Sequence, residues 1–306
     1  MSFKTEQRIF EIGNCKIGGQ PGELPTVLIG NVFYSGMPEI TNHKSGEFDK
    51  KSVTKWISIA ERFSEKTGVP HLLDVMASFP EAMKEYIAFV EGQNENTFLI
   101  DGSTAEATIA GLEIVKELGL QRRAILNAVS PQTDQSELDA IREAGVTAAI
   151  LLAQNDIDYS PQGRIEILMG FERQRGLLET AKEANLDRLL IDTIVFDVPS
   201  IAYAIEAVKL IKEELGFPAG FSPANATYEW KRVQDKVLKQ SFAAYNASAH
   251  TIAQLGGANF LIYGPLKQAR NVIPACAMTD AIIAYQATKQ FGTKPMVPNH
   301  PIYKIF

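Results

Sequence analysis

The sequence is poor in cysteine and histidine, and the placement of these residues excludes several kinds of site. Of 306 residues only two are cysteine, Cys15 and Cys276, and four are histidine. Two distant cysteines cannot form a disulfide framework, so we expect a reducing compartment, the cytoplasm. No histidine stands in a His-Glu-x-x-His pattern and no Cys-x-x-Cys pair occurs. The sequence therefore offers no recognisable zinc site, and we predict no bound metal.

Long apolar runs and an excess of positive charge are also missing. No run reaches the ~18 apolar residues needed to span a bilayer, and the first residues lack a signal-peptide pattern. Thirty Lys and Arg against 36 Asp and Glu give a net charge of −6 and a pI near 5.4. Nucleic-acid binding requires a basic face that neutralises phosphates. We therefore expect neither a membrane segment nor a nucleic-acid partner.

Three common catalytic or phosphate-binding motifs are absent as well. The sequence contains no Gly-x-x-x-x-Gly-Lys-Ser/Thr loop, no Gly-x-Gly-x-x-Gly turn between a strand and a helix, and no Gly-x-Ser-x-Gly elbow. These absences argue against P-loop, Rossmann and serine-hydrolase chemistry. No lysine ends a predicted strand, which argues against a Schiff-base aldolase.

What the sequence does contain is a series of eight short apolar runs separated by segments of helical periodicity. The runs lie at 26–31, 71–76, 97–101, 124–129, 148–152, 188–192, 219–222 and 258–263. Apolar strands that alternate with helices are typical of a parallel sheet buried on both faces. Eight such units predict an α/β protein with a single closed (β/α)₈ barrel, or TIM barrel, over 1–306. Residues 1–25 form an N-terminal extension, with a hairpin or lid expected at 8–19.

Two connecting segments carry further predictions. The periodicity of 228–255 indicates one long helix. The segment 33–55 has several glycines, lysines and a proline, and is predicted to be a long first loop, mobile or ligand-capping. Together with a second loop at 156–163, it either frames a docking partner or is an ordinary surface loop.

Polar residues stand repeatedly where the predicted strands end, which is where TIM barrels place their active sites. The array consists of Asn31, Asp74, Asp101, Asn127, Gln154, Asn155, Asp192, Ser222 and Asn225. A carboxylate can accept two N–H bonds from an amino-pyrimidine ring, and an asparagine can both donate and accept. The array therefore suits a planar heterocycle. Asp74, Asp101 and Asp192 could alternatively hold magnesium, as in a magnesium-dependent lyase.

Structural roles are open for the same residues. Asp101 precedes Gly102-Ser103-Thr104, so Asp101, Ser103 or Thr104 could cap the following helix. Asp74 and Asn127 lie inside apolar runs, and if buried they need hydrogen-bond partners from a ligand or a neighbouring strand.

Several segments resemble the family of the H subunit of tetrahydromethanopterin S-methyltransferase, within the wider group of pterin-binding barrels. The resemblance covers nearly the whole chain and is carried by 31–38, Leu73-Asp74-Val75-Met76-Ala77, Ile100-Asp101-Gly102-Ser103-Thr104, Ile191-Asp192-Thr193, 220–225 and 273–278. The chain looks most like the bacterial members that act as methylcorrinoid:tetrahydrofolate methyltransferases in glycine betaine demethylation. The dihydropteroate synthase pattern fits less well, because the turn Phe33-Tyr34-Ser35-Gly36 and the late Lys267 and Arg270 do not match it.

The resemblance implies a function and a set of site residues. A methyl group would pass from methylcob(III)amide on a corrinoid protein to N5 of tetrahydrofolate, giving 5-methyltetrahydrofolate and cob(I)amide. Asp101, Asn127, Asp192 and Asn225 would contact the pterin, Asp74 would support or extend these contacts, and Ser222 would share a loop with Asn225. Asn225, nearest N5, and Asp192 would be catalytic, and the chain would form a homodimer.

Other functions remain open beside this one. They are a component of a tetrahydromethanopterin-dependent methyltransferase, a dihydropteroate synthase-like enzyme, the magnesium-dependent lyase, and a non-catalytic protein that binds a pterin or acts as a scaffold.

Overall fold

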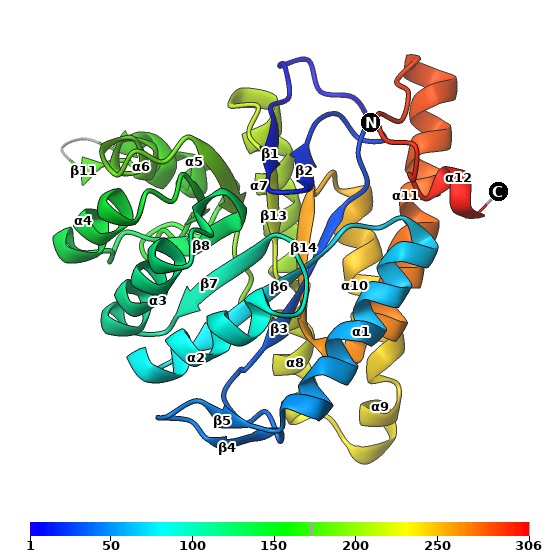
Figure 1. Cartoon of the computed structure of the whole chain (residues 1–306). Coiled ribbons are helices and arrows are strands. Elements are labelled where there is room, and N and C mark those ends of the chain that lie inside the picture. Colours follow the sequence, from blue (N-terminus) through cyan, green and yellow to red (C-terminus); the bar gives the residue numbers. More distant parts are fainter. Residues whose placement is uncertain (172–173, 306) are drawn as a thin grey trace.

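Eight parallel strands close into one barrel in the computed structural model, which describes residues 1–171 and 174–305. Around the ring the strands follow the order of the sequence, and the last pairs with the first (Figure 1). They are β3 (Val27–Val32), β6 (His71–Ala77), β7 (Phe98–Gly102), β8 (Ala124–Val129), β9 (Ala148–Leu152), β12 (Arg188–Asp192), β13 (Ala219–Phe221) and β14 (Phe260–Pro265). The predicted (β/α)₈ barrel is confirmed.

Helices surround this barrel and follow its strands (Figure 1). Local sequence sets several of their ends: α2 has Pro80 in its first turn, and α4 ends at Gly145, whose φ of 73° favours glycine. The helices are α1 (Lys50–Thr67), α2 (Pro80–Glu91), α3 (Ala105–Glu117), α4 (Gln135–Ala144), α5 (Pro161–Met169), α6 (Leu177–Glu183), α7 (Ile201–Glu214), α8 (Pro223–Val233), α9 (Lys236–Gln240), α10 (Phe242–Leu255), α11 (Ala269–Phe291) and α12 (Ile302–Ile305). No helix in the described part of the chain is long and apolar enough to cross a membrane.

The single helix predicted for 228–255 is wrong. The chain forms α8, α9 and α10 there, with a break at Gln234, whose ψ of 156° is extended. Asp235 then starts α9 by accepting a hydrogen bond from the backbone N–H of Leu238 at 2.9 Å. The side chain of Asp235 thus supplies a helix start that apolar periodicity alone does not reveal.

The two predicted loops are also more ordered than expected. Within 33–55 the chain forms the antiparallel pair β4 (Ile40–Asn42) and β5 (Glu47–Phe48), and α1 already begins at Lys50. Asp49 caps α1 by accepting from the N–H of Ser52. Likewise α5 begins at Pro161, inside the segment 156–163.

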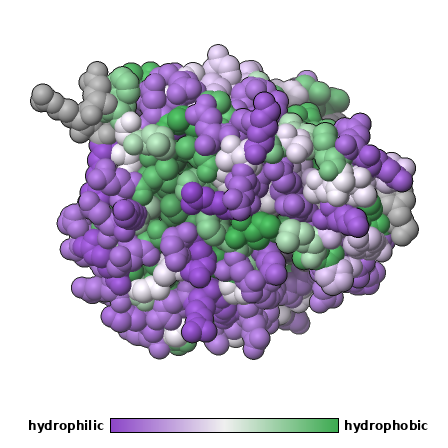
Figure 2. Space-filling view, turned by 90° about the horizontal axis from the view of Figure 1, so that it is seen from above, coloured by the Kyte–Doolittle hydropathy of each residue, from purple (hydrophilic) through white to green (hydrophobic). Residues whose placement is uncertain are grey.

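A hairpin closes the amino-terminal end of the barrel, as the alternation of 8–19 predicts. It consists of β1 (Ile9–Ile12) and β2 (Cys15–Gly18). Its turn is tied to the starts of two barrel strands: Thr97 Oγ1 donates to the carbonyl of Ile12 at 2.6 Å, and Gly13 N–H donates to the carbonyl of Arg122 at 2.8 Å. Seen from this side the surface is mainly hydrophilic, with smaller hydrophobic areas between (Figure 2).

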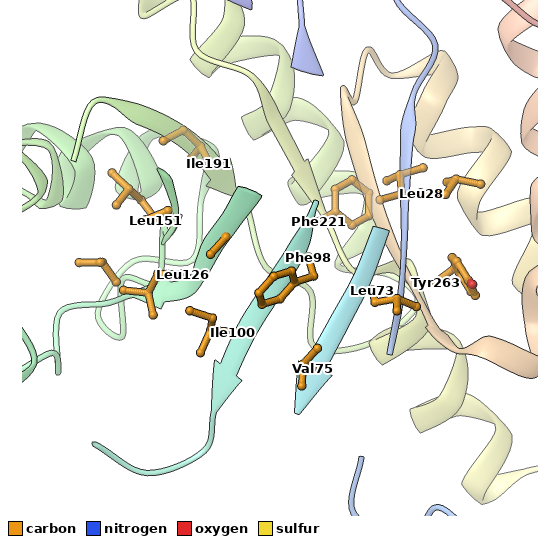
Figure 3. Close-up of a cluster of buried hydrophobic side chains, with 14 of the residues drawn as sticks. Leu28, Leu73, Val75, Phe98, Ile100, Leu126, Leu151, Ile191, Phe221 and Tyr263 are labelled. Carbon is orange, nitrogen blue, oxygen red and sulfur yellow. The ribbon is translucent and has the colours of Figure 1, made fainter. Parts of the chain in front are cut away.

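The strands alternate between two buried layers because successive side chains point to opposite faces. One set packs outward against the helices and includes Leu28, Leu73, Val75, Phe98, Ile100, Leu126, Leu151, Ile191, Phe221 and Tyr263 (Figure 3). The other set fills the barrel with the hairpin residues Ile12, Cys15 and Ile17, and includes Ile29, Leu72, Leu99, Ile125, Ile150, Leu190 and Ile262. Stepping two residues beyond this inner layer on five strands reaches Asn31, Asp74, Asp101, Asn127 and Asp192. The barrel interior therefore changes from apolar to polar toward the carboxyl ends of the strands.

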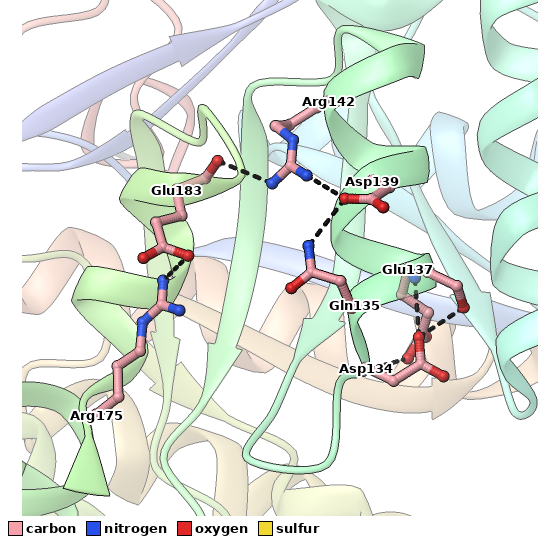
Figure 4. A network of polar contacts seen from close by, with 8 residues as sticks. Asp134, Gln135, Glu137, Asp139, Arg142, Arg175 and Glu183 are labelled. Atoms are coloured by element: carbon pink, nitrogen blue, oxygen red, sulfur yellow. Dashed lines mark hydrogen bonds and ion pairs between the residues drawn. The ribbon is translucent and has the colours of Figure 1, made fainter. Parts of the chain in front are cut away.

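On the outside of the barrel, α4 and α6 are linked by polar contacts (Figure 4). Asp134 and Glu137 form a capping box at the start of α4. Arg142 pairs with Asp139 and donates to the carbonyl of Glu183 at 3.2 Å. Exposed ion pairs contribute little stability, so these contacts orient the helices, whereas the buried layers provide most of the folding free energy.

Candidate functional site

The polar layer is organised around the carboxylate of Asp74, which is 1% exposed. Asn31 Nδ2 donates to Asp74 Oδ2 at 3.1 Å, and Asn127 Nδ2 donates to Asp74 Oδ1 at 3.2 Å. The side chain of Asp101 is hydrogen-bonded to Asp74 as well. The structure therefore joins the ends of β3, β6, β7 and β8 through one buried carboxylate.

Asp74 and Asp101 form a pair of buried carboxyl groups with raised pKa values. Burial raises the pKa of both carboxyl groups, and the negative charge of Asp74 raises the pKa of Asp101 further. Two carboxyl groups in contact cannot both be ionised at low cost, so Asp101 donates its proton to Asp74. The pair, in which Asp101 keeps its proton to higher pH than Asp74, is one of the features that could recognise a polar ring.

Asp101 does not cap the helix that follows it. Thr104 does so, with its Oγ1 accepting from the N–H of Ala107 at 3.2 Å, while Ser103 Oγ donates to Ser78 Oγ at 2.6 Å. Asp101 instead lines a cavity of about 230 Å³ together with Met76 and Ser103. The capping alternative raised for Asp101 is therefore wrong, and its carboxyl group faces the site.

Asp192, at the end of β12, is 6% exposed and has a different set of neighbours. Its Oδ1 accepts a hydrogen bond from the N–H of Ile194 at 2.7 Å. Ile194 has a φ of 55°, a conformation that a β-branched side chain adopts only under constraint. Burial raises the pKa of Asp192 to about 6, against the opposing effects of the Ile194 N–H and the Arg164 guanidinium. Asp192 thus shapes the turn into α7 and places a carboxylate at the barrel mouth.

Ser222 and Asn225 lie at the start of α8. Ser222 is buried, and its Oγ donates to the carbonyl of Ile262 at 3.2 Å, which links β13 to β14. Asn225 is exposed in the first turn of the helix. Of the predicted site residues, Asp74, Asp101 and Asn127 are joined by hydrogen bonds, whereas Asp192 and Ser222 bond to other partners and Asn225 lies on the rim.

Two contributions were not predicted as part of the site. Asn31 was recognised at a strand end, but its hydrogen bond to Asp74 depends on the register Asn31↔Asp74 between β3 and β6. The sequence did not indicate a role for Arg164, because nothing in a helix-forming segment shows that one arginine side chain turns inward and becomes buried.

Neither of two larger cavities lies in this polar layer. A cavity of about 350 Å³ is lined by Cys15, His71 and other residues at the amino-terminal ends of the strands. A cavity of about 420 Å³ is a groove over α7, α8 and α10, lined by apolar side chains such as Ile205 and Trp230. Cavity volume therefore does not identify the site. The direction of the strands and the position of the buried polar groups identify it.

The carboxylates do not gather into a metal site. Within 1–171 and 174–305, no three His, Cys, Asp or Glu side chains are grouped so that they could hold a metal ion. Asp74, Asp101 and Asp192, which the sequence offered as magnesium ligands, do not form such a group.

The barrel has counterparts among known proteins. Two solved structures share the fold: Yersinia pestis DHPS with a pterine–sulfa conjugate (TM-score 0.57, 14% identity, covering 90% of this chain and 98% of that one) and the Yersinia pestis dihydropteroate synthase (TM-score 0.55, 13% identity, the same coverage). At this identity they support the fold alone, a (β/α)₈ barrel of the kind seen in pterin-binding proteins.

Sequence comparison identifies the family. The sequence model of the tetrahydromethanopterin S-methyltransferase MtrH subunit matches residues 5–296. The H subunit of this enzyme from Methanothermobacter thermautotrophicus is 37% identical over 99% of both chains, and that from Methanosarcina mazei is 32% identical over 99% of both. The H subunit of a putative methyltransferase, mtx, from Methanosarcina barkeri is 33% identical over 98% of both. The chain belongs to the tetrahydromethanopterin S-methyltransferase MtrH family and is a methyltransferase of this type.

Proposed function

We propose that this chain transfers a methyl group between N5 of a tetrahydropterin and the cobalt of a corrinoid carried by a partner protein. The names of its relatives support tetrahydromethanopterin as the pterin more than tetrahydrofolate, which the bacterial resemblance favoured. The observation that carries the proposal is the polar layer around Asp74, at the end of the barrel where such folds bind substrates.

The donor and acceptor groups of this layer suit the edge of a pterin. An ionised Asp192 can accept two N–H bonds from the amino-pyrimidine ring, and Asp101 with Asn127 can contact the ring from another side. Asp74 has its acceptors used by Asn31, Asn127 and Asp101, so its role is to hold these groups in place. Asn225, on the rim, is the residue we assign to N5 and to the catalytic step.

In the direction of pterin methylation, N5 forms a bond to the methyl carbon as the cobalt–carbon bond breaks. The electron pair of that bond remains on cobalt, and N5 loses a proton. The transfer requires no protein nucleophile, so the chain acts by positioning the pterin and by matching its charge. An asparagine suits the position beside N5 because it can accept from the N–H form and donate to the deprotonated form.

The proposal also includes two protein interfaces. A corrinoid is large, so its carrier must dock over the carboxyl-terminal end of the barrel, beside β4, β5 and the turn before α5. We further propose a homodimer, as the family resemblance implies. Sedimentation of the purified chain at several concentrations measures the oligomeric state, and a monomer throughout contradicts this part.

An anaerobic spectral assay tests the function. The purified chain is mixed with methylcobalamin and either tetrahydromethanopterin or tetrahydrofolate, while cob(I)alamin absorbance and methylated pterin are measured. We expect both products to form only with the chain present, and faster with tetrahydromethanopterin. Pterin binding with no transfer, even from a methylated corrinoid protein, would support the non-catalytic alternative.

Variants then separate binding from transfer. Asn225→Ala should reduce turnover per bound pterin more than it reduces pterin affinity, because Asn225 acts at N5. Asn14→Ala is the matched control, since Asn14 is an exposed asparagine at the opposite end of the barrel and its side chain donates to Asn96 Oδ1. Loss of affinity with unchanged turnover per bound pterin refutes the role of Asn225.

A further inference from the structure

Arg164 is a charged residue that is buried, although it belongs neither to the apolar core of the barrel nor to the exposed surface. It lies in the first turn of α5 and is 2% exposed. Its Nη2 donates to the carbonyl of Ile194 at 3.4 Å, and its Nη1 has no hydrogen-bond partner among the described residues. Arginine is rarely buried unless it is paired, because removing its charge from water is costly. A counter-charge must therefore offset this burial.

The guanidinium reaches the same turn that Asp192 holds. Ile194, with its φ of 55°, donates its N–H to Asp192 and accepts from Arg164 at its carbonyl. The constrained residue is thus held at its N–H by one site side chain and at its carbonyl by Arg164. Movement of Arg164 would release the carbonyl side of the turn from which Asp192 projects.

Three charged groups are coupled through Arg164. They are the Asp192 carboxylate from β12, the Arg164 guanidinium from α5, and the Asp158 carboxylate from the segment before α5. Asp158 already accepts from the N–H and the hydroxyl of Ser160, both at 2.8 Å. Arg164 lowers the pKa of Asp192 against the effect of burial, so Asp192 is its counter-charge within the barrel mouth.

We infer that Arg164 is a positioning residue of the pterin site, which fixes the Ile194 turn and thereby the place from which the Asp192 carboxyl group meets the N–H groups of the ligand. The inference rests on the proposed function for the identity of the ligand. The effect of Arg164 on Asp192 can be tested without the pterin. A neutral side chain at 164 should let Asp192 take up a proton at higher pH, and a protonated carboxyl group no longer accepts two hydrogen bonds.

The first experiment measures this coupling without a pterin. The chain is labelled with ¹³C-carboxyl aspartate and titrated by NMR, and the Asp192 signal is identified by its loss in Asp192→Asn. We expect Arg164→Met to raise the Asp192 titration midpoint by about one pH unit. Arg164→Lys, which keeps the charge, should leave the midpoint near that of the wild type. An unchanged midpoint in folded Arg164→Met overturns the inference, and Arg164→Gln provides the same comparison if the Met variant does not fold.

The second experiment follows tetrahydromethanopterin affinity against pH. In the wild type we expect the affinity to decrease as the pH falls below about 6. In Arg164→Met the same decrease should begin about one pH unit higher. Asp192→Asn should bind weakly at every pH, and adding Arg164→Met to it should produce no further shift. If Arg164→Met still binds tetrahydromethanopterin and its affinity falls at the same pH as in the wild type, the role of Arg164 is refuted. Absence of pterin binding by the wild type at any pH instead refutes the proposed function.

Discussion

Two aspartates buried at opposite ends of the barrel have similar ionisation but different surroundings. Asp280, in α11, is 4% exposed, and burial raises its pKa to about 7; Asp192 is 6% exposed, with a pKa raised to about 6. Asp280 accepts from the N–H of Thr26 at 3.1 Å, from the Thr26 hydroxyl at 2.8 Å and from Gln254 Nε2 at 3.0 Å. Asp192 accepts one such bond, from the backbone N–H of Ile194.

The comparison separates a structural acid from a ligand-binding one. Burial and a raised pKa are shared, so neither property identifies function. What differs is how far protein donors satisfy the carboxylate, and on which side of the sheet it lies. Thr26 directly precedes β3, so Asp280 acts where the barrel strands begin, whereas Asp192 ends a strand.

Replacing Asp280 should have the largest effect on folding. Asp280→Ala leaves the N–H and the hydroxyl of Thr26 buried without their acceptor and removes one of the acceptors of Gln254 Nε2, so we expect the free energy of unfolding to fall by about 3 kcal/mol. Urea denaturation measures this loss. Pterin affinity of the folded fraction should be unchanged, and a loss of affinity at constant stability would reverse the assignment of the two aspartates.

Replacing Asp192 should affect binding more than folding. Asp192→Asn keeps an oxygen for the Ile194 N–H but presents an amide to the N–H groups of the pterin, so we expect affinity to fall about 100-fold. Isothermal calorimetry measures the affinity. The free energy of unfolding should fall by about 2 kcal/mol, less than in Asp280→Ala, because buried Arg164 loses one of its counter-charges and keeps Asp158. The prediction fails if the variant unfolds readily while it still binds pterin normally.

The pH dependence of stability sharpens the contrast at Asp280. Its pKa is raised in the folded chain, so the stability it contributes through proton uptake is complete below its ordinary value near 4 and is lost as pH rises through about 7. The stability advantage of the wild type over Asp280→Asn should therefore shrink between pH 4 and 7, by up to about 1.4 kcal/mol per pH unit. Denaturation of both proteins across this range measures how the stability difference changes with pH. A difference that grows with pH would contradict the prediction.

The smallest expected effect concerns a residue next to the site that serves folding alone. Thr104→Ala removes the cap of α3 and should lower the free energy of unfolding by about 1 kcal/mol. Pterin affinity should not change, whereas Asp101→Asn, three residues earlier, should weaken it. Equal losses of affinity in both variants would indicate that the helix start, and not the Asp101 carboxyl, contributes to binding.

Much of the barrel is predictable because its strands are short apolar runs with turn residues between them. Each observed strand lies within two residues of its predicted bounds. The inward direction of Asp74, Asp101, Asn127 and Asp192 follows from the same alternation, since each lies two residues beyond an apolar interior position. The elements that the sequence did not reveal depend on single polar caps, as at Asp235 before α9.

The partners of the site residues could not be predicted, because they depend on register and on tertiary packing. The meeting of Asn31 with Asp74 requires two strands to align, and that of Asp74 with Asn127 requires residues from strands that are not neighbours in the ring. The burial of Arg164 depends on how α5 packs over the barrel. None of these contacts leaves a local pattern in the sequence.

The pairing of β14 with β3 has a consequence for synthesis of the chain. These strands are separated by more of the sequence than any other neighbouring pair in the ring, so the barrel cannot close until residue 265 has left the ribosome. Until then the growing sheet has two unpaired edges, which are the places where sheets join wrong partners. The hairpin at the amino-terminal end must also wait, because Arg8 bonds to Gly216 and Gly13 to Arg122. The hairpin, which is made before the barrel strands, is therefore among the last segments to reach its final position, and during that interval the nascent chain is exposed to aggregation.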